Sequence, residues 1–265
     1  SAWFAIMRSG VRTPYSPSIL LNRNQKKRDK MKTIGIIGGM GPLATVDLYR
    51  RIVLRTKAER DQDHIHVIID SNTDIPDRTK AIIADGEDPT VELVKSAKRL
   101  EHAGADFLIM PCNTAHYFID TVSESVHIPF VNMLEETVKS TCDKYGKNTV
   151  VGIMATDGTV KSGIYEKYYS KVGIKTIVPD KTQKKIMRFI YDVVKAGKLE
   201  QGTDLFFECV EELKQKGADA FLLGCTELSS AQYYYGFEGP FINPMEVLTE
   251  ASIKYAGGEA VLKIS

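Results

Sequence analysis

The chain has 265 residues, of which 43% are apolar and 26% are charged, the balance of an ordinary globular protein. This length accommodates one large domain or two smaller ones, each with its own core. No uninterrupted apolar run approaches the roughly 20 residues that a membrane span requires, so we expect no membrane partner. The four cysteines show neither paired CxxC spacing nor the density of a disulfide scaffold, which predicts a reducing, cytoplasmic setting.

The formal net charge of +1 is unevenly distributed along the chain. Residues 1–30 contain seven Lys or Arg and a single acid, and the remainder carries 28 basic and 33 acidic residues. A folded body of negative charge does not suit phosphate-backbone binding, so nucleic acid is not an expected partner. Residues 1–30 also lack helical or strand periodicity, whereas a well-formed strand pattern starts at Met31. We therefore predict that residues 1–30 are a disordered or non-native extension.

From Met31 onward, short apolar runs alternate with amphipathic helical patterns. Their hydrophobicity is continuous rather than alternating, which indicates strands covered on both faces, as in a parallel sheet with helical crossovers. The predicted fold class is therefore α/β. The predicted buried strands, in chain order, are Thr33–Gly38, His66–Asp70, Asp106–Met110, Phe130–Asn132, Val150–Met154 and Ala220–Leu223.

The sequence also contains an internal repeat. The segment GADFLIMPCNT at 104–114 returns as GADAFLLGCTE at 217–227, with a cysteine at the same offset from each Gly-Ala-Asp. Three matched pieces in the same order predict two similar α/β units. The other two matched pairs are IGII at 34–37 with VGIM at 151–154, and IPFVNM at 128–133 with GPFINP at 239–244.

Two similar units predict two parallel-sheet domains related by a pseudo-two-fold. We expect residues 31–129 plus 240–265 to form the first domain and residues 130–239 to form the second. Ligands of open parallel sheets bind beyond the carboxyl ends of the strands, where Cys112 and Cys225 are predicted to lie. The two thiols should therefore approach one cleft from opposite sides.

Two opposed thiols suit a reaction that removes a proton from one face of a carbon and returns a proton to the other face. A thiolate of tuned pKa accepts a proton, and its protonated partner donates one. Asn113, Thr114 and Thr226 add donors beside the thiols, and free N–H groups at strand-to-helix turns favour a carboxylate. A single cysteine after a strand is usually a core residue, but a pair at equivalent positions favours function. Cys142 and Cys209 have no counterpart in the repeat and are predicted to be structural.

Three motifs resemble the signatures of the aspartate/glutamate racemase family, specifically its aspartate racemase branch. They are GGMGP at 38–42, PCNTAH at 111–116 and GCTE at 224–227, and the likeness runs from Met31 nearly to the end. The resemblance implies two flavodoxin-like domains with the active site between them, no pyridoxal phosphate, and a homodimer. The implied reaction is racemisation of an acidic amino acid, with aspartate favoured over glutamate.

The same resemblance implies roles for individual residues. Cys112 and Cys225 correspond to the catalytic pair, and a bidentate guanidinium at Arg78 suits the side-chain carboxylate of the substrate. The substrate-binding residues that the resemblance implies are Arg78, Asn113, Thr114, Ala115 and Lys195; Thr226 joins them as a donor beside the second thiol.

Other interpretations are open. GMGPLA at 39–44 fits a dinucleotide-binding turn and would indicate an NAD-dependent enzyme, although Pro42 removes a backbone donor there. His116 could activate Cys112 as in a cysteine hydrolase, but a helix-packing or supporting role is favoured. Glu227 either raises the thiol pKa of its neighbour or simply occupies a helix N-terminus. No histidines and cysteines have convincing metal-site spacing, so no metal is expected.

Two further function classes are compatible with the same cleft. One is another carbanion enzyme of the superfamily, a decarboxylase or an isomerase; a decarboxylase needs only one proton donor. The other is a non-catalytic protein that binds an amino acid.

Overall fold

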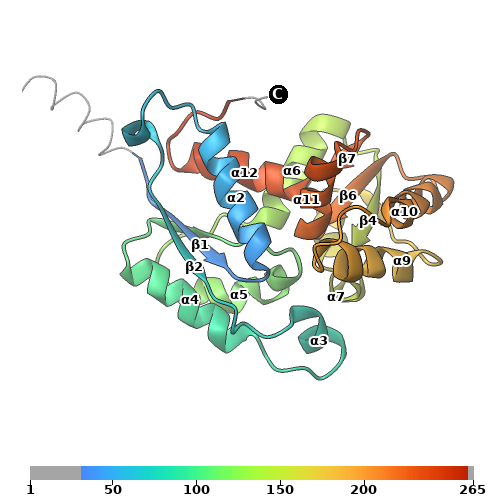
Figure 1. Cartoon of the computed structure of the whole chain (residues 1–265), viewed down its shortest axis with the longest axis horizontal. Helices are drawn as coiled ribbons and strands as arrows, with labels where there is room; N and C mark the ends of the chain where they lie inside the picture. The colour runs from blue at the N-terminus through green and yellow to red at the C-terminus, as the bar shows by residue number, and fades with distance from the viewer. Residues whose placement is uncertain (1–30, 262–265) are drawn as a thin grey trace, which may run out of the picture. The chain divides into compact units, whose positions relative to one another are not determined.

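The structure is a computed structural model that describes residues 31–261 (Figure 1). Residues 1–30, for which an extension is predicted, lie outside the described residues, as do residues 262–265. The described strands are β1 (Ile34–Gly38), β2 (Val67–Ser71), β3 (Phe107–Ile109), β4 (Val150–Ala155), β5 (Lys175–Ile177), β6 (Ala220–Gly224) and β7 (Phe241–Ile242). The α-helices are α2 (Pro42–Arg55), α3 (Arg78–Ile83), α4 (Thr90–His102), α5 (Ile119–Glu124), α6 (Met133–Tyr145), α7 (Asp157–Ser162), α8 (Ile164–Ser170), α9 (Gln183–Arg188), α10 (Thr203–Gln215), α11 (Thr226–Tyr235) and α12 (Pro244–Tyr255). Shorter helical turns are η2 (Asp61–Asp63), η3 (Thr114–Phe118) and the π-helix η4 (Phe189–Val194).

The strands form two parallel sheets, which confirms the predicted α/β class. The first has the order β2-β1-β3, and an isolated parallel bridge from Leu108 to Phe130 continues it. The second has the order β5-β4-β6-β7, with Phe221 paired to Phe241. Leu108 and Phe221 are equivalent in the repeat. Each half therefore repeats the flavodoxin-like strand order in the same register.

The repeated Gly-Ala-Asp segments make the same contacts in both halves. Asp106 accepts a hydrogen bond from the backbone N–H of Thr33 at 2.6 Å, and Asp219 accepts one from Val150 at 2.8 Å. Each carboxylate thus ties the start of a central strand to its neighbour.

The glycine of each IG or VG pair is fixed by close packing. A Cβ on Gly35 would lie 2.8 Å from the Cβ of Ala105, and a Cβ on Gly152 would lie 3.1 Å from that of Ala218. A larger residue at either position would clash with that alanine and with the helix before it, at Leu100 of α4 or Leu213 of α10.

Helices cover the sheets and enclose two hydrophobic clusters. The first surrounds Ile37 and Leu108 and is closed by α4 and α5, and the second surrounds Leu223 and Phe206 beneath α9 to α11. In Figure 1, α2 and α12 run beside one another, and α12 also packs on α6. Within residues 31–261, no helix combines the length and apolarity that crossing a membrane requires.

Three details of the strand prediction are wrong. The predicted strand Phe130–Asn132 forms only one bridge, because Asn132 already caps α6. β2 is only partly buried, because it is an edge strand with one side left to solvent. The edge strands β5 and β7 are absent from the predicted strands, because β5 is also partly exposed and β7 is only two residues long. Phe130 pairs with the first sheet and Phe241 with the second, and the division into two domains with its boundaries stays a prediction.

Candidate active site

Cys112 and Cys225 line one small cavity of about 20 Å³. Cys112 follows β3, and Cys225 follows β6 directly and is the N-cap residue of α11. Each residue is only 6% exposed. The carboxyl ends of β3 and β6, the equivalent strands of the two sheets, therefore bring together the two cysteines that the repeat singles out.

A carboxylate and an ammonium group accompany Cys225. Its Sγ donates to the Oε2 atom of Glu227 at 2.7 Å, and the hydroxyl of Thr226 donates to the same oxygen at 3.3 Å. The Nζ atom of Lys195 lies 3.7 Å from Oε1 of Glu227. One buried carboxylate thus connects the thiol to a cation.

These neighbours and burial set the protonation of the site. Burial, followed by the charge of Glu227, raises the pKa of the Cys225 thiol well above its ordinary value, and Lys195 opposes this only in part. Burial lowers the pKa of Lys195, but the acidic groups around it, first of all Glu227, outweigh it and raise that pKa overall. The structure therefore keeps Cys225 as a thiol and Lys195 as an ammonium ion.

His116 supports the backbone beside Cys112. Its Nδ1 atom lies 2.8 Å from the carbonyl oxygen of Cys112, and its Nε2 atom accepts the N–H of Met133 at 3.3 Å. This pair of contacts fits a neutral ring with its proton on Nδ1. Burial lowers the pKa of His116 from 6.5 to about 4, which keeps the ring neutral. The histidine joins the turn after β3 to the start of α6, as favoured by the sequence, and its nitrogens are occupied by backbone groups.

Asn113 presents an unused donor at the same cavity. Its side chain is 2% exposed, and its Oδ1 atom accepts the hydroxyl proton of Tyr165, a fully buried residue of α8. Its Nδ2 atom is buried without a hydrogen-bond partner. Because a buried unpaired N–H costs free energy, this donor is suited to an acceptor that enters the cavity.

Four threonines join the two halves beside the cavity. The hydroxyl of Thr114 lies 3.1 Å from that of Thr156 and 2.8 Å from that of Thr159. Thr79 donates to Thr156 at 3.4 Å. Thr114 therefore lines the cavity and also joins the segment after β3 of the first sheet to the segment after β4 of the second sheet.

Arg78 lines the cavity, but its terminal nitrogens are already engaged. Nη1 donates to the carbonyl oxygens of Pro76 at 2.8 Å and Ile75 at 3.3 Å, and Nη2 donates to that of Met40 at 3.2 Å. Only its Nε is buried without a partner. In this structure, Arg78 fastens two loops, and of its five N–H donors the Nε–H and the second N–H of Nη2 remain for a ligand.

The structure places the other predicted residues as follows. Thr226 and Lys195 line the cavity with the two cysteines. Ala115 does not line it, and instead packs in the first hydrophobic cluster with no exposed surface. Cys209 is buried in the second cluster, where burial raises its thiol pKa to about 12, and Cys142 lies on α6 away from the cavity.

Met40 and Tyr191 also line the cavity, and sequence reasoning missed both. Met40 follows Gly39, whose φ of 90° lies in the region that favours glycine. A Cβ on Gly39 would also lie only 2.2 Å from the carbonyl oxygen of Asn72. Tyr191 belongs to the π-helix η4, and the Nζ atom of Lys195 lies 4.4 Å from its ring centroid. A π-helical segment often marks a functional site, but nothing in the local sequence distinguishes it from ordinary helix.

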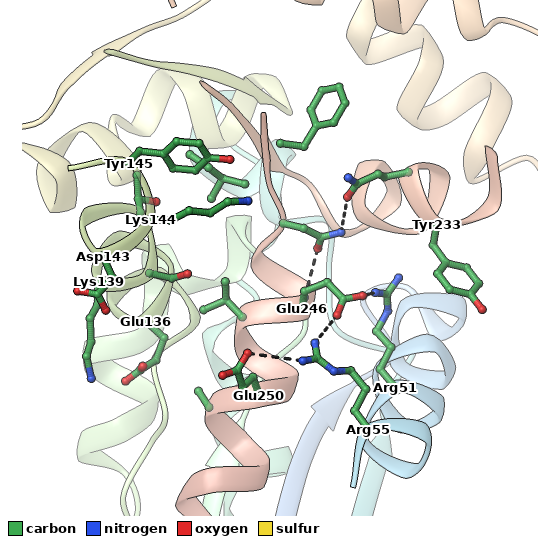
Figure 2. Close-up of a pocket in the computed structure, with 18 of the residues that line it drawn as sticks. Arg51, Arg55, Glu136, Lys139, Asp143, Lys144, Tyr145, Tyr233, Glu246 and Glu250 are labelled. Atoms are coloured by element: carbon green, nitrogen blue, oxygen red, sulfur yellow. Dashed lines mark hydrogen bonds and ion pairs between the residues drawn. The ribbon is translucent and has the colours of Figure 1, made fainter. Parts of the chain in front are cut away.

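A larger cavity of about 800 Å³ contains neither cysteine. Figure 2 shows its wall, where Arg51 and Arg55 of α2 point toward Glu246 and Glu250 of α12. Arg55 pairs with Glu246 at 2.6 Å and with Glu250 at 3.6 Å, and Arg51 pairs with Glu246. These charges neutralise one another, so this cavity is a weaker candidate than the thiol-lined one.

Within residues 31–261, no three His, Cys, Asp or Glu side chains gather in a way that could hold a metal ion.

Comparison with known proteins finds similarity along almost the whole described chain. Residues 37–251 match the family described as Asp/Glu/Hydantoin racemase. The broad specificity amino-acid racemase RacX of Bacillus subtilis (strain 168) is 28% identical over 232 residues, covering 83% of this chain and 96% of that protein. The solved aspartate racemase of Picrophilus torridus is 34% identical with a TM-score of 0.76, and the match covers 87% of this chain and 96% of that one. An aspartate racemase homologue from Pyrococcus horikoshii OT3, 24% identical with a TM-score of 0.68, shares the fold over 86% of this chain and 100% of its own.

Proposed function

The chain belongs to the Asp/Glu/hydantoin racemase family, and from this premise we propose that it racemises an acidic amino acid without a cofactor, with Cys112 and Cys225 as its two bases. Aspartate is the favoured substrate and glutamate the next. The observation that carries the proposal is the presence of both thiols in one cavity, each at the carboxyl end of a central strand. The name of the Picrophilus torridus relative supports aspartate.

In the proposed reaction, the two thiols lie on opposite faces of the α-carbon. Cys225 begins as the acid, because burial and Glu227 hold its proton. Cys112 begins as the thiolate and takes the α-proton, which leaves a carbanion whose charge spreads into the substrate carboxylate. Cys225 then delivers its proton to the other face and becomes a thiolate. The reverse reaction exchanges the two roles.

The residues around the thiols would hold the substrate and the developing charge. The free Nδ2 donor of Asn113 and the start of α11, which no side chain caps, suit the α-carboxylate, whose charge grows in the transition state. Lys195 and the Nε atom of Arg78 are placed to meet a second carboxylate. Thr114 and Thr226 complete the polar wall.

Incubation in deuterated water tests this function. L- and D-aspartate and L- and D-glutamate are each mixed with the protein, and deuterium at Cα is measured by mass spectrometry after chiral separation. Exchange accompanied by appearance of the opposite enantiomer is expected. Absence of exchange with all four amino acids would rule out the proposed function and favour a binding protein.

A decarboxylase that uses the same cleft would behave differently. It needs one proton donor, so one of the variants Cys112→Ser and Cys225→Ser would retain activity. It would also release carbon dioxide, which the racemase does not.

We further propose, from the family resemblance and the cysteine pattern, a cytoplasmic homodimer, and light scattering after size exclusion tests the dimer.

A further inference from the structure

A second pocket of about 450 Å³ adjoins the thiol-lined cavity. We call it the outer pocket: it is bounded by the turn at residues 39–44, by residues 194–199 after η4, and by residues 227–234 of α11. The two spaces share four lining residues, Met40, Arg78, Lys195 and Glu227. The outer pocket is therefore the continuation of the proposed active site.

The cavity between the thiols is too small for a substrate by itself. About 20 Å³ is the space of roughly one water molecule, so an amino acid needs room beyond it. The α-carbon must lie between the sulfurs of Cys112 and Cys225, and the carboxylate donors lie beside them. Two substituents remain, the ammonium group and the side chain, and the side chain is the one long enough to extend past the four shared residues into the outer pocket.

The wall of the outer pocket is mainly apolar. Leu43, Val194, Leu199, Ala231 and Tyr234 line it. Neither of its two acidic residues presents a free charge: Glu227 pairs with Lys195, and Asp47 accepts hydrogen bonds from Arg51 at 3.0 Å and from Ser230 at 3.0 Å. A long apolar side chain would thus exchange water for hydrocarbon along most of its length.

The cations at the mouth of the pocket need no substrate carboxylate. Both terminal nitrogens of Arg78 donate to backbone carbonyl oxygens, and Lys195 pairs with Glu227 and lies over the ring of Tyr191. Strong rejection of a neutral analogue arises when it leaves buried polar groups unpaired. Here a neutral side chain leaves the Nε–H and the second Nη2–H of Arg78 in the unpaired state that they already have.

We propose that the outer pocket is a side-chain subsite, so that the protein racemises amino acids with long apolar or aromatic side chains, such as methionine and phenylalanine, in addition to acidic ones. This inference rests on the proposed function, because it places the α-carbon between the two thiols. Acidic substrates reach the cations at the mouth, and longer neutral ones extend beyond them.

The test compares α-deuterium exchange of L-aspartate, L-methionine and L-phenylalanine in the native chain and in two variants. Leu43→Trp adds bulk in the outer pocket at a side chain that is 73% exposed, so the fold should tolerate it. Val46→Trp places the same side chain one helical turn further on α2, at a residue that is 62% exposed and does not line the pocket.

We expect the native chain and Val46→Trp to exchange all three substrates. In Leu43→Trp, kcat/KM for methionine and phenylalanine should fall about tenfold or more relative to that for aspartate, the scale at which a hydrophobic pocket discriminates. Exchange of aspartate without exchange of methionine or phenylalanine would overturn the subsite and leave the proposed function intact. An equal loss for all three substrates in Leu43→Trp would overturn it too, since the pocket would then be only an access route. Absence of exchange for every substrate in the native chain would remove both proposals.

Discussion

The Sγ atom of Cys225 donates a hydrogen bond to the Oε2 atom of Glu227 over 2.7 Å, at the edge of a cavity that Cys112 also lines. The repeat makes the two cysteines equivalent in the fold, but their surroundings differ. Cys112 is followed by Asn113 and Thr114, and Cys225 by Thr226 and a carboxylate. Equivalent backbone positions with unequal side chains give one thiol a defined starting role as the acid.

Substitution of either cysteine should abolish two-sided proton exchange. Cys112→Ser and Cys225→Ser are each expected to lower kcat for racemisation by about 100-fold or more, the contribution typical of a positioned acid or base. Chiral chromatography of the products measures this rate. Cys142→Ser, which lies on α6 away from the cavity, is the control and should keep full activity. Full activity in either active-site variant would contradict the assignment.

Removal of the charge on Glu227 should lower the pKa of Cys225. The carboxylate opposes formation of a thiolate beside it, and its loss also leaves Lys195 free to favour that thiolate. Alkylation of Cys225, followed by peptide mass mapping across a pH series, should therefore begin at lower pH in Glu227→Gln. Glu227→Asp keeps the charge and serves as the control. An unchanged or raised alkylation pH in Glu227→Gln would show that the carboxylate does not hold the thiol proton.

Acid should destabilise the fold through His116. Its pKa is about 4 in the folded chain and 6.5 ordinarily, so between these values the unfolded chain binds a proton that the folded chain does not. Stability is therefore full above about pH 6.5 and falls by up to about 3 kcal/mol as the pH drops toward 4.

Urea unfolding between pH 7.5 and 5 measures this slope. His116→Gln should flatten the pH dependence, whatever its effect on stability at pH 7.5. His127→Gln, which alters a 98% exposed side chain, should leave the slope as it is. A slope that survives in His116→Gln would assign the acid sensitivity to other groups.

The two helix caps of the repeat should contribute similar stability. Asn132 accepts hydrogen bonds from two N–H groups at the start of α6, and Asn243 does the same for α12. Asn132→Ala and Asn243→Ala should each lower the free energy of unfolding by about 1 kcal/mol. The matched aspartate variants keep an accepting oxygen and should restore most of it. Unequal losses would mean that the contacts to Tyr168 and Gln232, rather than the caps, set the effect.

The sequence predicts the framework of the site because the framework is local. The strand, the turn after it and the start of the next helix are encoded together around each Gly-Ala-Asp. The repeat therefore predicts a cysteine at the same position after that strand in both units. The short edge strand Lys175–Ile177 was missed because only one side of it packs, so its sequence carries a weak hydrophobic signal.

Pairing across the cavity could not be predicted in the same way. Tyr191 reaches the cavity through a π-helix, and the terminal nitrogens of Arg78 meet the carbonyl oxygen of Met40, 38 positions away in the chain. Such contacts depend on how loops from different strands meet. The family resemblance assigned Arg78 to a substrate carboxylate, and the structure adds its backbone partners.

The most direct test of the two-base account is the fate of deuterium in the first turnovers. The native chain is incubated with L-aspartate in deuterated water, and recovered L-aspartate and newly formed D-aspartate are separated and analysed for label at Cα. With one thiol on each face, the D-aspartate should carry deuterium while the recovered L-aspartate carries almost none, and the reverse should hold from D-aspartate. Equal early labelling of both enantiomers, or unlabelled product, would mean that one base serves both faces and would contradict the roles of Cys112 and Cys225.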